Sequence, residues 1–305
     1  MANDTVTVCE VGPRDGLQMA RDILPTEVKL RWIRQLAQAG LREIEVGSFV
    51  SPERVPQMAD TAAVVRGALA IEGLTVCALA GNLRGVVAAH AAGAHVVAIP
   101  ISVSDTHSRA NVNKGTDAQI EMVRSAVDWV RAQARPMRID VAAATAFGCS
   151  MEGQVPLQRV VDVAAALAAT GADTIALADT VGYANPAQVR ATVRAVRAAV
   201  GPRLSKLHLH DTMGMGLANA LAGLDEGIRA FDSCLGGLGG CPFAPGASGN
   251  IVTEDLVFML ANMGHATGIR HAALVAARQL LADALPGETL RGATAVAVLP
   301  RSFAG

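Results

Sequence analysis

Aromatic residues are scarce in this chain of 305 residues: Phe, Trp and Tyr together make up 3%, whereas 51% of the residues are hydrophobic. Ala, Val and Leu supply most of the apolar mass, which suits close packing of helices on a parallel sheet. Neither charge is in excess, since the formal net charge is −1 and Lys and Arg are scattered along the chain. We therefore expect no nucleic-acid partner, because such binding needs a concentrated positive surface.

The chain also lacks paired cysteines, long apolar runs and a signal sequence. No Cys-x-x-Cys pair occurs among its five cysteines, which argues against a disulfide framework and a structural zinc site. No apolar run approaches the ~20 residues of a membrane span, and the N-terminus has neither the basic start nor the apolar stretch of a signal peptide. These absences favour a cytoplasmic protein with no membrane partner.

A unit repeats along the chain: an Ala-rich helical pattern, a glycine and, a few residues later, a short β-rich run. The glycine can supply the left-handed cap that ends a helix, and it stands at Gly40, Gly93, Gly171 and Gly227. A helical pattern follows each β-rich run, and the runs lie near residues 5–11, 43–46, 75–79, 95–99, 137–144, 173–177, 205–210 and 229–232. Eight such units predict an α/β fold, a (β/α)8 TIM barrel over residues 1–270, and the helical pattern of 271–305 predicts a C-terminal helical extension packed on it.

Polar residues cluster where the predicted strands end, which is where a barrel of this kind carries its chemistry. In chain order they are Arg14, Asp15, Glu45, Ser48, Asn82, Asp179, Thr180, His208 and His210, and the stretch 234–250 follows the last strand. Residues scattered by core packing alone would not favour one end of every strand. These positions are therefore the candidates for a functional site.

His208-Leu209-His210 is the most specific of these features, because alternation along a strand points both imidazoles to one face, about 7 Å apart along the backbone. Two such rings can share a metal ion, and Asp15 and Asn250 can complete a mixed oxygen and nitrogen set. The oxygens favour Mg²⁺ or Mn²⁺, while the imidazoles shift the preference toward Mn²⁺, Co²⁺ or Zn²⁺. The alternatives are two histidines on an ordinary buried strand and turn roles for Asp15 and Asn250, each of which adjoins a glycine.

Arg14 adjoins Asp15, and its permanently charged fork suits an enolate or a carboxylate. Glu45 and Asp179 are expected either to orient the metal ligands or to act as a base, and a salt bridge inside the barrel mouth is the alternative.

The segment 236–242, Gly-Gly-Leu-Gly-Gly-Cys-Pro, is expected to be a mobile loop because it is too rich in glycine for a packed element. Loops of this kind often close over barrel mouths, and Cys241 would then be a proton donor or acceptor rather than an inert core thiol. A nucleotide site is not favoured, since no Gly-x-Gly-x-x-Gly opens a helix after a strand.

Several segments carry a family resemblance: residues 10–18 with Gly-Pro-Arg-Asp-Gly, 48–52, 55–58, 208–212 with His-Leu-His-Asp-Thr, and 236–250 with Gly-Gly-Cys-Pro followed by 253–256. With them the chain, from about residue 5 to 265, resembles the 3-hydroxy-3-methylglutaryl-CoA lyases, within the wider group of metal-dependent lyase and synthase barrels. The sister synthases share the Arg-Asp and His-x-His elements but lack the Gly-Gly-Cys-Pro loop.

The resemblance implies retro-aldol cleavage of a tertiary 3-hydroxyacyl-CoA to acetyl-CoA and a keto acid. It implies that Mg²⁺ or Mn²⁺ is bound by four ligands, Asp15, His208, His210 and Asn250. It also implies that Arg14 stabilises the thioester enolate and that Cys241 takes part in proton transfer. Glu45 and Asp179 match positions that the family uses near the cation. Cofactor and substrate binding are assigned to Gln18, Ser48, Asn82 and Thr180, and the resemblance also implies a homodimer.

The chain departs from the family pattern in its predicted fifth strand. Where the family usually has a Tyr and a Ser, this chain has the run 140–145, Asp-Val-Ala-Ala-Ala-Thr; Met19 stands in place of an Asn and Ala176 in place of a Ser. Lost hydroxyls remove polar contacts to the acyl group and enlarge the pocket. We therefore predict that a related thioester, such as citramalyl-CoA or a longer branched 3-hydroxyglutaryl-CoA, is preferred over 3-hydroxy-3-methylglutaryl-CoA.

Two other functions remain open at this point. A synthase of the same group would condense acetyl-CoA with a 2-oxo acid, although the loop cysteine and the short C-terminus argue against it. A barrel kept only for binding would be expected to have lost a metal ligand, and all four candidate ligands are present.

Overall fold

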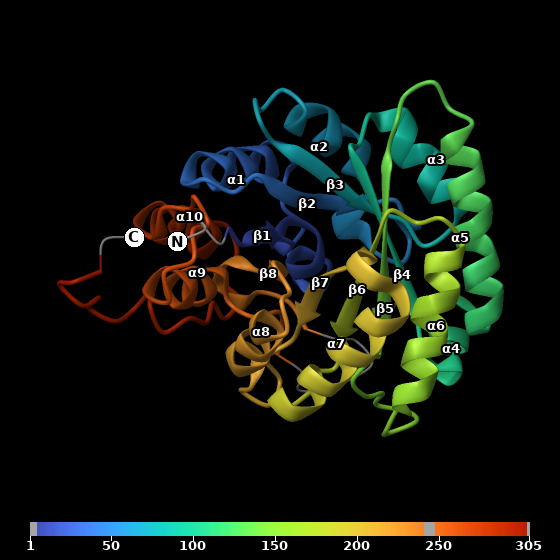
Figure 1. The fold of residues 1–305 in the computed structure, drawn as a ribbon. Coiled ribbons are helices and arrows are strands. Elements are labelled where there is room, and N and C mark those ends of the chain that lie inside the picture. The colour runs from blue at the N-terminus through green and yellow to red at the C-terminus, as the bar shows by residue number, and fades with distance from the viewer. Residues whose placement is uncertain (1–4, 241–247, 304–305) are drawn as a thin grey trace.

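The computed structural model describes residues 5–240 and 248–303, and within these ranges eight parallel strands close into a barrel (Figure 1). Each strand pairs with the next one along the chain, and β8 pairs with β1. The strands are β1 Thr7–Glu10, β2 Glu43–Ser48, β3 Thr75–Leu79, β4 Val96–Ser102, β5 Arg138–Ala144, β6 Thr174–Asp179, β7 Leu204–Leu209 and β8 Ala230–Ser233. The predicted TIM barrel is confirmed.

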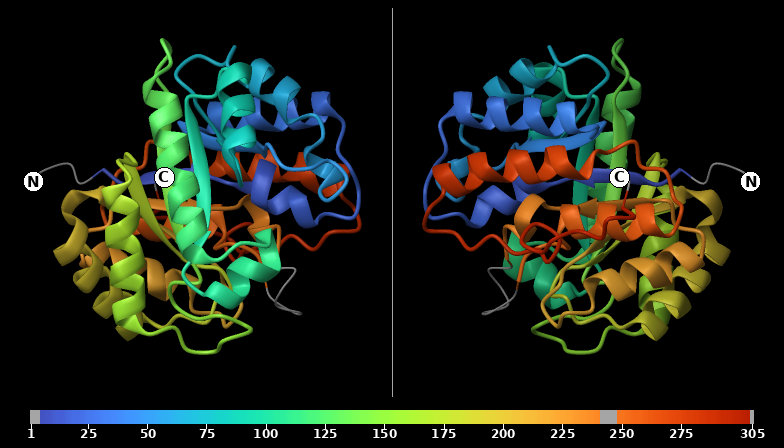
Figure 2. Two further views of the ribbon diagram at one scale, coloured as in Figure 1. Left: turned by 90° about the vertical axis from the view of Figure 1, so that its right-hand side faces the viewer. Right: turned by 90° about the vertical axis from the view of Figure 1, so that its left-hand side faces the viewer.

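Helices surround the barrel, as the two further views in Figure 2 show. They are α1 Thr26–Ala39, α2 Thr61–Ala68, α3 Leu83–Ala92, α4 Asp105–Val112, α5 Thr116–Arg131, α6 Leu157–Ala169, α7 Pro186–Val200, α8 Gly216–Asp225, α9 Thr253–Asn262 and α10 His271–Ala284. Gly40 and Gly93 end α1 and α3 in the left-handed region, with φ of 115° and 100°. The repeated glycine therefore has the helix-ending role that the sequence predicts.

The helices turn an apolar face to the barrel. In α1 the side chains of Trp32, Ile33 and Leu36 are fully buried, while Arg31 and Arg34 on the same helix are exposed. Burial of each apolar side chain of this size stabilises the fold by roughly 1.5–3 kcal/mol. The apolar mass of the sequence thus lies mainly between strands and helices.

Charged side chains fill the inside of the barrel near the amino ends of the strands. Glu43 on β2 accepts hydrogen bonds from Lys206 on β7 at 2.8 Å and from Arg138 on β5 at 2.9 Å. These strands are not neighbours, so the ion pairs cross the barrel interior. Lys206 also lies 3.2 Å from Asp232 on β8. These ion pairs occupy this part of the barrel interior, and the cavity described below lies toward the carboxyl ends of the strands.

Glu10, at the end of β1, joins three segments at that carboxyl end. Its Oε1 accepts hydrogen bonds from the amides of Gly12 and Leu235, both at 2.9 Å, and its Oε2 accepts one from Thr253 Oγ1 at 2.7 Å. The side chain is fully buried, and this burial raises the pKa of Glu10 to about 8, although the hydrogen bonds lower it. One carboxyl group thus links the loops after β1 and β8 to the start of α9.

Replacement of Glu10 by Gln is expected to make the free energy of unfolding depend less on pH. Because the folded-state pKa of about 8 lies above the ordinary 4.5, the folded protein keeps a proton that the unfolded chain has lost, and stability falls as the pH rises between these values. Each pKa unit corresponds to about 1.4 kcal/mol, so the fall should amount to a few kcal/mol. Gln keeps the carbonyl acceptor without the charge, and Glu10→Gln should remove this slope. Urea unfolding at pH 5 and pH 8 measures the change of the unfolding free energy with pH. An equal change in the parent and in Glu10→Gln would contradict the raised pKa.

The glycine-rich segment after β8 is packed at its beginning, which corrects the expectation of a mobile loop from residue 236 onward. Gly236 and Gly237 are buried, with φ of 65° and 58°. The Gly236 amide donates to Glu254 at 2.9 Å, and Arg291 donates to both glycine carbonyls, at 2.7 and 2.6 Å. Glycine occurs at both positions because the backbone there is left-handed and tightly packed, a conformation that other residues rarely adopt. Cys241 lies outside the described residues.

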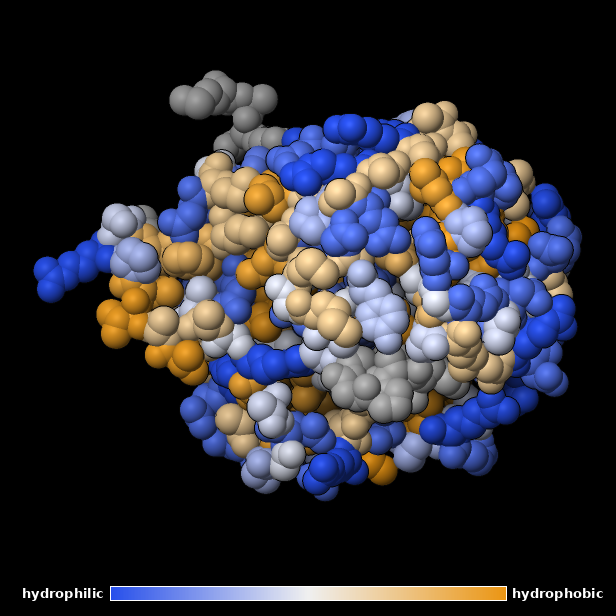
Figure 3. All heavy atoms as spheres, turned by 90° about the horizontal axis from the view of Figure 1, so that it is seen from below, coloured by the Kyte–Doolittle hydropathy of each residue, from blue (hydrophilic) through white to orange (hydrophobic). Residues whose placement is uncertain are grey.

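The segment after the barrel is helical only in part. The helix α10 lies against α1, beside the barrel (Figure 2). Residues 285–303 contain no helix or strand, so the predicted helical extension holds for 271–284 alone. Val296 and Val298 in this segment are 81% and 99% exposed, and apolar side chains gather in Figure 3 on the side where Figure 1 places the C-terminal segment.

No helix within the described ranges is long and apolar enough to cross a membrane.

Candidate active site

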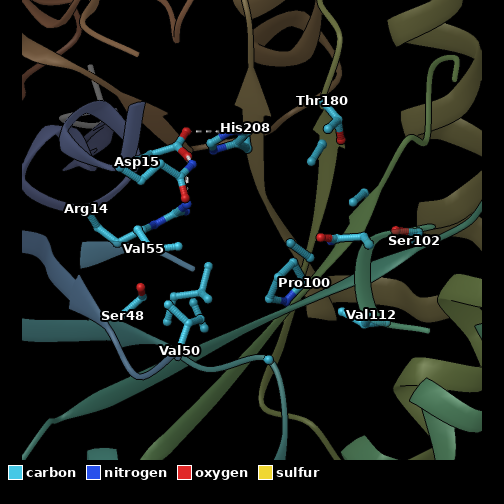
Figure 4. A pocket seen from close by; sticks show the side chains of 18 of the residues that line it. Arg14, Asp15, Ser48, Val50, Val55, Pro100, Ser102, Val112, Thr180 and His208 are labelled. Atoms are coloured by element: carbon cyan, nitrogen blue, oxygen red, sulfur yellow. Dashed lines mark hydrogen bonds and ion pairs between the residues drawn. The ribbon is translucent and has the colours of Figure 1, made fainter. Parts of the chain in front are cut away.

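A cavity of about 770 Å³ opens at the carboxyl ends of the strands (Figure 4). Most of the polar residues predicted for the site line it: Arg14, Asp15, Gln18, Glu45, Ser48, Asn82, Thr180, His208 and His210. Asp179 and Asn250 are buried next to these residues but are not among the lining side chains. The structure thus brings residues from β1, β2, β3, β6 and β7 to one place, as the barrel topology predicts.

The two histidines face one another at the end of β7. Their Nε2 atoms are 3.2 Å apart, and Asp15 Oδ2 lies 3.6 Å from each of them. Among the described residues, these three side chains form a cluster whose ligand atoms lie within 4.8 Å of one another. Two imidazole nitrogens and a carboxylate oxygen are suitable ligands for one divalent cation.

Asn250 adds a fourth donor to this cluster. Its Nδ2 donates to Asp15 Oδ2 at 2.6 Å, and its backbone forms an isolated bridge with His210. Its Oδ1 is buried without a hydrogen-bond partner in the described part of the chain. A buried carbonyl oxygen with no partner is costly unless something else binds it, and a cation at the cluster would do so. The donor set therefore fits a bound divalent metal.

Asp232 is a site residue that the sequence analysis missed. It lies on β8 in register with His208, and its Oδ2 accepts a hydrogen bond from His208 Nδ1 at 3.1 Å. A proton on Nδ1 leaves the Nε2 lone pair pointing at the cluster, which is how carboxylates usually orient metal-binding histidines. In the sequence, Asp232 is recognisable only as an acidic residue at an inward-facing position of a short strand. The register between β7 and β8 is what brings it to His208.

Arg14 is held between two carboxylates. Its Nη1 donates to Asp15 Oδ1 at 2.6 Å, and its Nε donates to Glu45 Oε1 at 2.5 Å. Gln18 Nε2 also donates to Asp15 Oδ1, at 2.5 Å. Glu45 therefore forms the salt bridge in the barrel mouth that was the alternative to its two functional roles. Arg14 is fixed beside the cluster with 11% of its side chain exposed.

Burial and neighbouring charges shift the pKa values of the site residues in different directions. Burial alone would raise the pKa of Asp15, but Arg14 and the two histidines hold it well below its usual range, so the carboxylate is ionised. Burial lowers the pKa of His210, and the adjoining His208 adds to this effect. Burial also opposes protonation of His208, but Asp232 and Asp15 outweigh it and raise its pKa. Burial raises the pKa of Glu45, with Arg14 acting against it.

Asp179 lies behind the cavity wall. Its two carboxylate oxygens accept the backbone amides of Tyr183 and Ala184, both at 3.0 Å, so the side chain organises the loop after β6. Burial raises the pKa of Asp179 to about 6 in spite of these hydrogen bonds. No hydrogen bond or ion pair within the described residues joins Asp179 to Asp15, His208 or His210, although the charge of His208 acts to lower the pKa of Asp179.

Three other residues predicted to bind the substrate, Asn82, Thr180 and Ser48, line the cavity. Each of them also forms a hydrogen bond that fixes a neighbouring loop. Asn82 Oδ1 accepts the Gly85 amide at 2.9 Å and so caps α3, and Thr180 Oγ1 accepts the Thr145 amide at 2.8 Å. The backbone of Ser48 exchanges hydrogen bonds with Thr61 Oγ1. These three residues thus shape the cavity wall at the ends of β2, β3 and β6.

The alanines of the fifth strand lie only in part where the sequence analysis expected them. Ala142 and Ala144 line the cavity, whereas Ala143 points to the other face of the strand, as alternation requires. Ala176 does not line the cavity either, and Ala178, two residues closer to the carboxyl end of β6, does. The prediction of a wall stripped of hydroxyls therefore applies to residues 142, 144 and 178.

The HMGL-like family profile matches residues 5–281 of the chain. A hydroxymethylglutaryl-CoA lyase of Bacillus subtilis is 40% identical over 278 residues, which cover 91% of this chain and 92% of that protein. A relative from Rattus norvegicus, named 3-hydroxy-3-methylglutaryl-CoA lyase, cytoplasmic, is 43% identical over 87% of this chain and 76% of its own length. A mitochondrial hydroxymethylglutaryl-CoA lyase of Bos taurus is 40% identical over 93% of this chain and 87% of its own length.

Solved structures are similar over nearly the whole chain. The crystal structure of the Bacillus subtilis HMG-CoA lyase superposes with a TM-score of 0.91 at 38% identity and covers 96% of this chain and 97% of that one. An HMG-CoA lyase from Acinetobacter baumannii, in complex with coenzyme A and 3-methylmalate, gives a TM-score of 0.93 at 37% identity and covers 100% of this chain and 99% of that one.

Proposed function

The chain belongs to the HMGL-like family, and on this premise we propose that it is a carbon–carbon lyase that cleaves a tertiary 3-hydroxyacyl-CoA, 3-hydroxy-3-methylglutaryl-CoA or a close relative, to acetyl-CoA and a keto acid. The observation that carries the proposal is the convergence of Asp15, His208 and His210 beside Arg14 at the end of the barrel where ligands bind. The comparisons with lyases over most of the chain support the same reaction.

Asp15, His208, His210 and Asn250 would hold a divalent cation, Mg²⁺ or Mn²⁺. When bound, such an ion supplies a Lewis acid that lowers the energy of negative charge on substrate oxygens. Asp232 keeps His208 in the tautomer that presents Nε2 to the cluster, and Arg14 and Gln18 fix the orientation of Asp15.

In the cleavage step a base accepts the proton of the C3 hydroxyl, C3 and its oxygen become a ketone, the bond between C2 and C3 breaks, and its electron pair passes to the thioester as an enolate. Arg14 provides a fixed positive charge for that enolate, because Asp15 and Glu45 hold the guanidinium in place before the reaction starts. Protonation of the enolate at C2 then gives acetyl-CoA. A role of Cys241 in this proton transfer stays a prediction of the family resemblance.

A synthase that condenses acetyl-CoA with a 2-oxo acid remains the second function. The same cluster and the same arginine would serve it, because condensation also passes through a thioester enolate. The curated relatives reported above are lyases, which favours cleavage.

The purified protein is expected to cleave tertiary 3-hydroxyacyl-CoA thioesters only with a divalent cation. A panel of thioesters is assayed with Mg²⁺ or Mn²⁺, with and without a chelator, and the products are identified by mass. Acetyl-CoA and a 2-oxo acid are supplied in parallel as a test for condensation. Full turnover after chelation would remove the metal from the proposal, and condensation without cleavage would favour the synthase.

We further propose that the protein works in the cytoplasm as a homodimer. The described cysteines, Cys9, Cys77, Cys149 and Cys234, are buried thiols, and a reducing compartment keeps thiols in this form. The exposed side chains of Val296 and Val298 support a protein contact at the C-terminal segment, and sedimentation of the purified protein tests the homodimer.

A further inference from the structure

The wall of the cavity formed by β4, β5 and β6 carries only small side chains, and they are Ala98, Pro100, Ala142, Ala144 and Ala178. In the closed order of eight strands, β4 and β5 lie opposite β8 and β1. The part of this small-residue wall on β4 and β5 therefore faces the metal cluster across the barrel, whereas Ala178 on β6 lies beside His208 on β7. The chain leaves space there that larger side chains would fill.

The small-residue wall ends in a buried polar pair. Ser102 is the last residue of β4, and its Oγ lies 2.8 Å from Nδ1 of His107 on α4. Both side chains line the cavity, although they are only 4% and 3% exposed. Figure 4 shows Ser102 across the pocket from Asp15 and His208, with Pro100 in between. A ligand that extends along the wall from the metal cluster would thus meet this pair at its far end.

The pair is held in place by its own surroundings. Ser104 Oγ accepts the His107 amide at 3.1 Å and caps α4, and the Ser102 carbonyl accepts Thr116 Oγ1 at 2.9 Å. Contacts fixed before a ligand arrives discriminate well between ligands, because no ordering of side chains has to accompany binding.

We propose that this half of the cavity binds a C3 substituent larger than a methyl group, and that Ser102 and His107 hydrogen-bond an oxygen atom at the end of that substituent. The inference rests on the proposed function, in which the C3 hydroxyl and the thioester lie at the metal cluster. The remaining substituents of C3 then extend toward β4 and β5. The preferred substrate is accordingly a 3-hydroxyglutaryl-CoA in which an oxygen-bearing branch replaces the C3 methyl group of 3-hydroxy-3-methylglutaryl-CoA, beside the carboxymethyl group that C3 already carries.

Three 3-hydroxyglutaryl-CoA thioesters that keep the carboxymethyl group and differ only in the other C3 branch test the inference. The first carries a methyl group and is 3-hydroxy-3-methylglutaryl-CoA, the second an all-carbon chain, and the third a chain of equal length that ends in a hydroxyl or a carboxylate. We expect kcat/KM to rise in that order, by about tenfold or more for each methylene that the wall accommodates. The terminal oxygen should add a further preference over the all-carbon branch. A clear lead of the methyl thioester would overturn the inference.

Substitutions separate the two parts of the proposal. Ser102→Ala and His107→Leu should each lower the preference for the oxygen-ended branch over the all-carbon branch by about tenfold or more. Ala142→Val should narrow the cavity and lower the preference for long branches over methyl. The matched control Ala143→Val makes the same change on the opposite face of β5 and should leave that preference as it is, while its melting temperature reports any damage to the core.

The outcomes distinguish this inference from the function on which it rests. Cleavage of the methyl thioester alone, with ratios that do not respond to substitution of Ser102, His107 or Ala142, overturns the inference and leaves the lyase intact. Failure of all three thioesters to be cleaved with Mg²⁺ or Mn²⁺ overturns both.

Discussion

Replacement of His210 or His208 by Ala is expected to abolish cleavage while the barrel stays folded. Each substitution removes one of two imidazoles whose Nε2 atoms are 3.2 Å apart and leaves the Asp15 carboxylate without enough partners to retain a cation. Loss of a group that only orients a metal ligand commonly costs 10–100-fold in affinity or activity, so loss of a ligand should cost at least ~10³-fold. Calorimetry with Mn²⁺ and the rate of acetyl-CoA release measure the two effects.

His95→Ala is the matched control for these variants. His95 is exposed just before β4, at the amino end of the barrel, and accepts the Val76 amide through Nδ1. The control should bind Mn²⁺ and turn over as the parent does, and circular dichroism should be the same for all of these proteins. A His210→Ala protein with parental Mn²⁺ affinity and turnover would show that the imidazoles are not metal ligands.

The barrel and much of its site could be predicted from the sequence because their signals are local. A glycine such as Gly93 ends a helix through its own φ, and alternation along β7 alone places His208 and His210 on one face. The position of Arg14 and Asp15 after the first strand then follows from the rule that parallel strands end at the same rim of the barrel.

The residues that the sequence analysis missed depend on contacts between distant segments. Asp232 meets His208 only through the register of two strands, and Glu43 meets Arg138 only across the barrel interior. Asp179 ends a strand as the other candidate site residues do, and only the structure shows that its oxygens bind the amides of the loop that follows. The partner that a side chain meets and the register between distant strands are not encoded in any short segment.

The glycine-rich segment illustrates a different limit. Many glycines in a row are compatible with a mobile loop and equally with a backbone so tightly packed that no side chain fits. At Gly237 a Cβ atom would lie 3.0 Å from Val252, and the positive φ of this residue adds strain for any other amino acid. Only the packing of Glu254 and Arg291 around the segment decides between these two interpretations.

Replacement of Arg14 by Lys is expected to lower kcat by about 10²- to 10³-fold while KM changes little, because one preorganised donor for a developing oxyanion has an effect of this size. Lys keeps the positive charge, but a single ammonium group cannot bond Asp15 and Glu45 through separate nitrogens as Arg14 does, with contacts of 2.6 and 2.5 Å. Steady-state kinetics with the best thioester of the panel, at saturating Mg²⁺, separate kcat from KM.

Glu45→Gln is the informative companion to Arg14→Lys, because it leaves the guanidinium in the chain but removes one of the two carboxylates that hold it. If Arg14 acts on the enolate, Glu45→Gln should lower kcat less than Arg14→Lys does, since Asp15 still anchors Nη1 at 2.6 Å. Near-normal turnover in Arg14→Lys would instead mean that this residue only stabilises the fold around Asp15. In that case both variants should lose melting temperature without a specific loss of kcat, and the charge that stabilises the enolate would have to come from the cation alone.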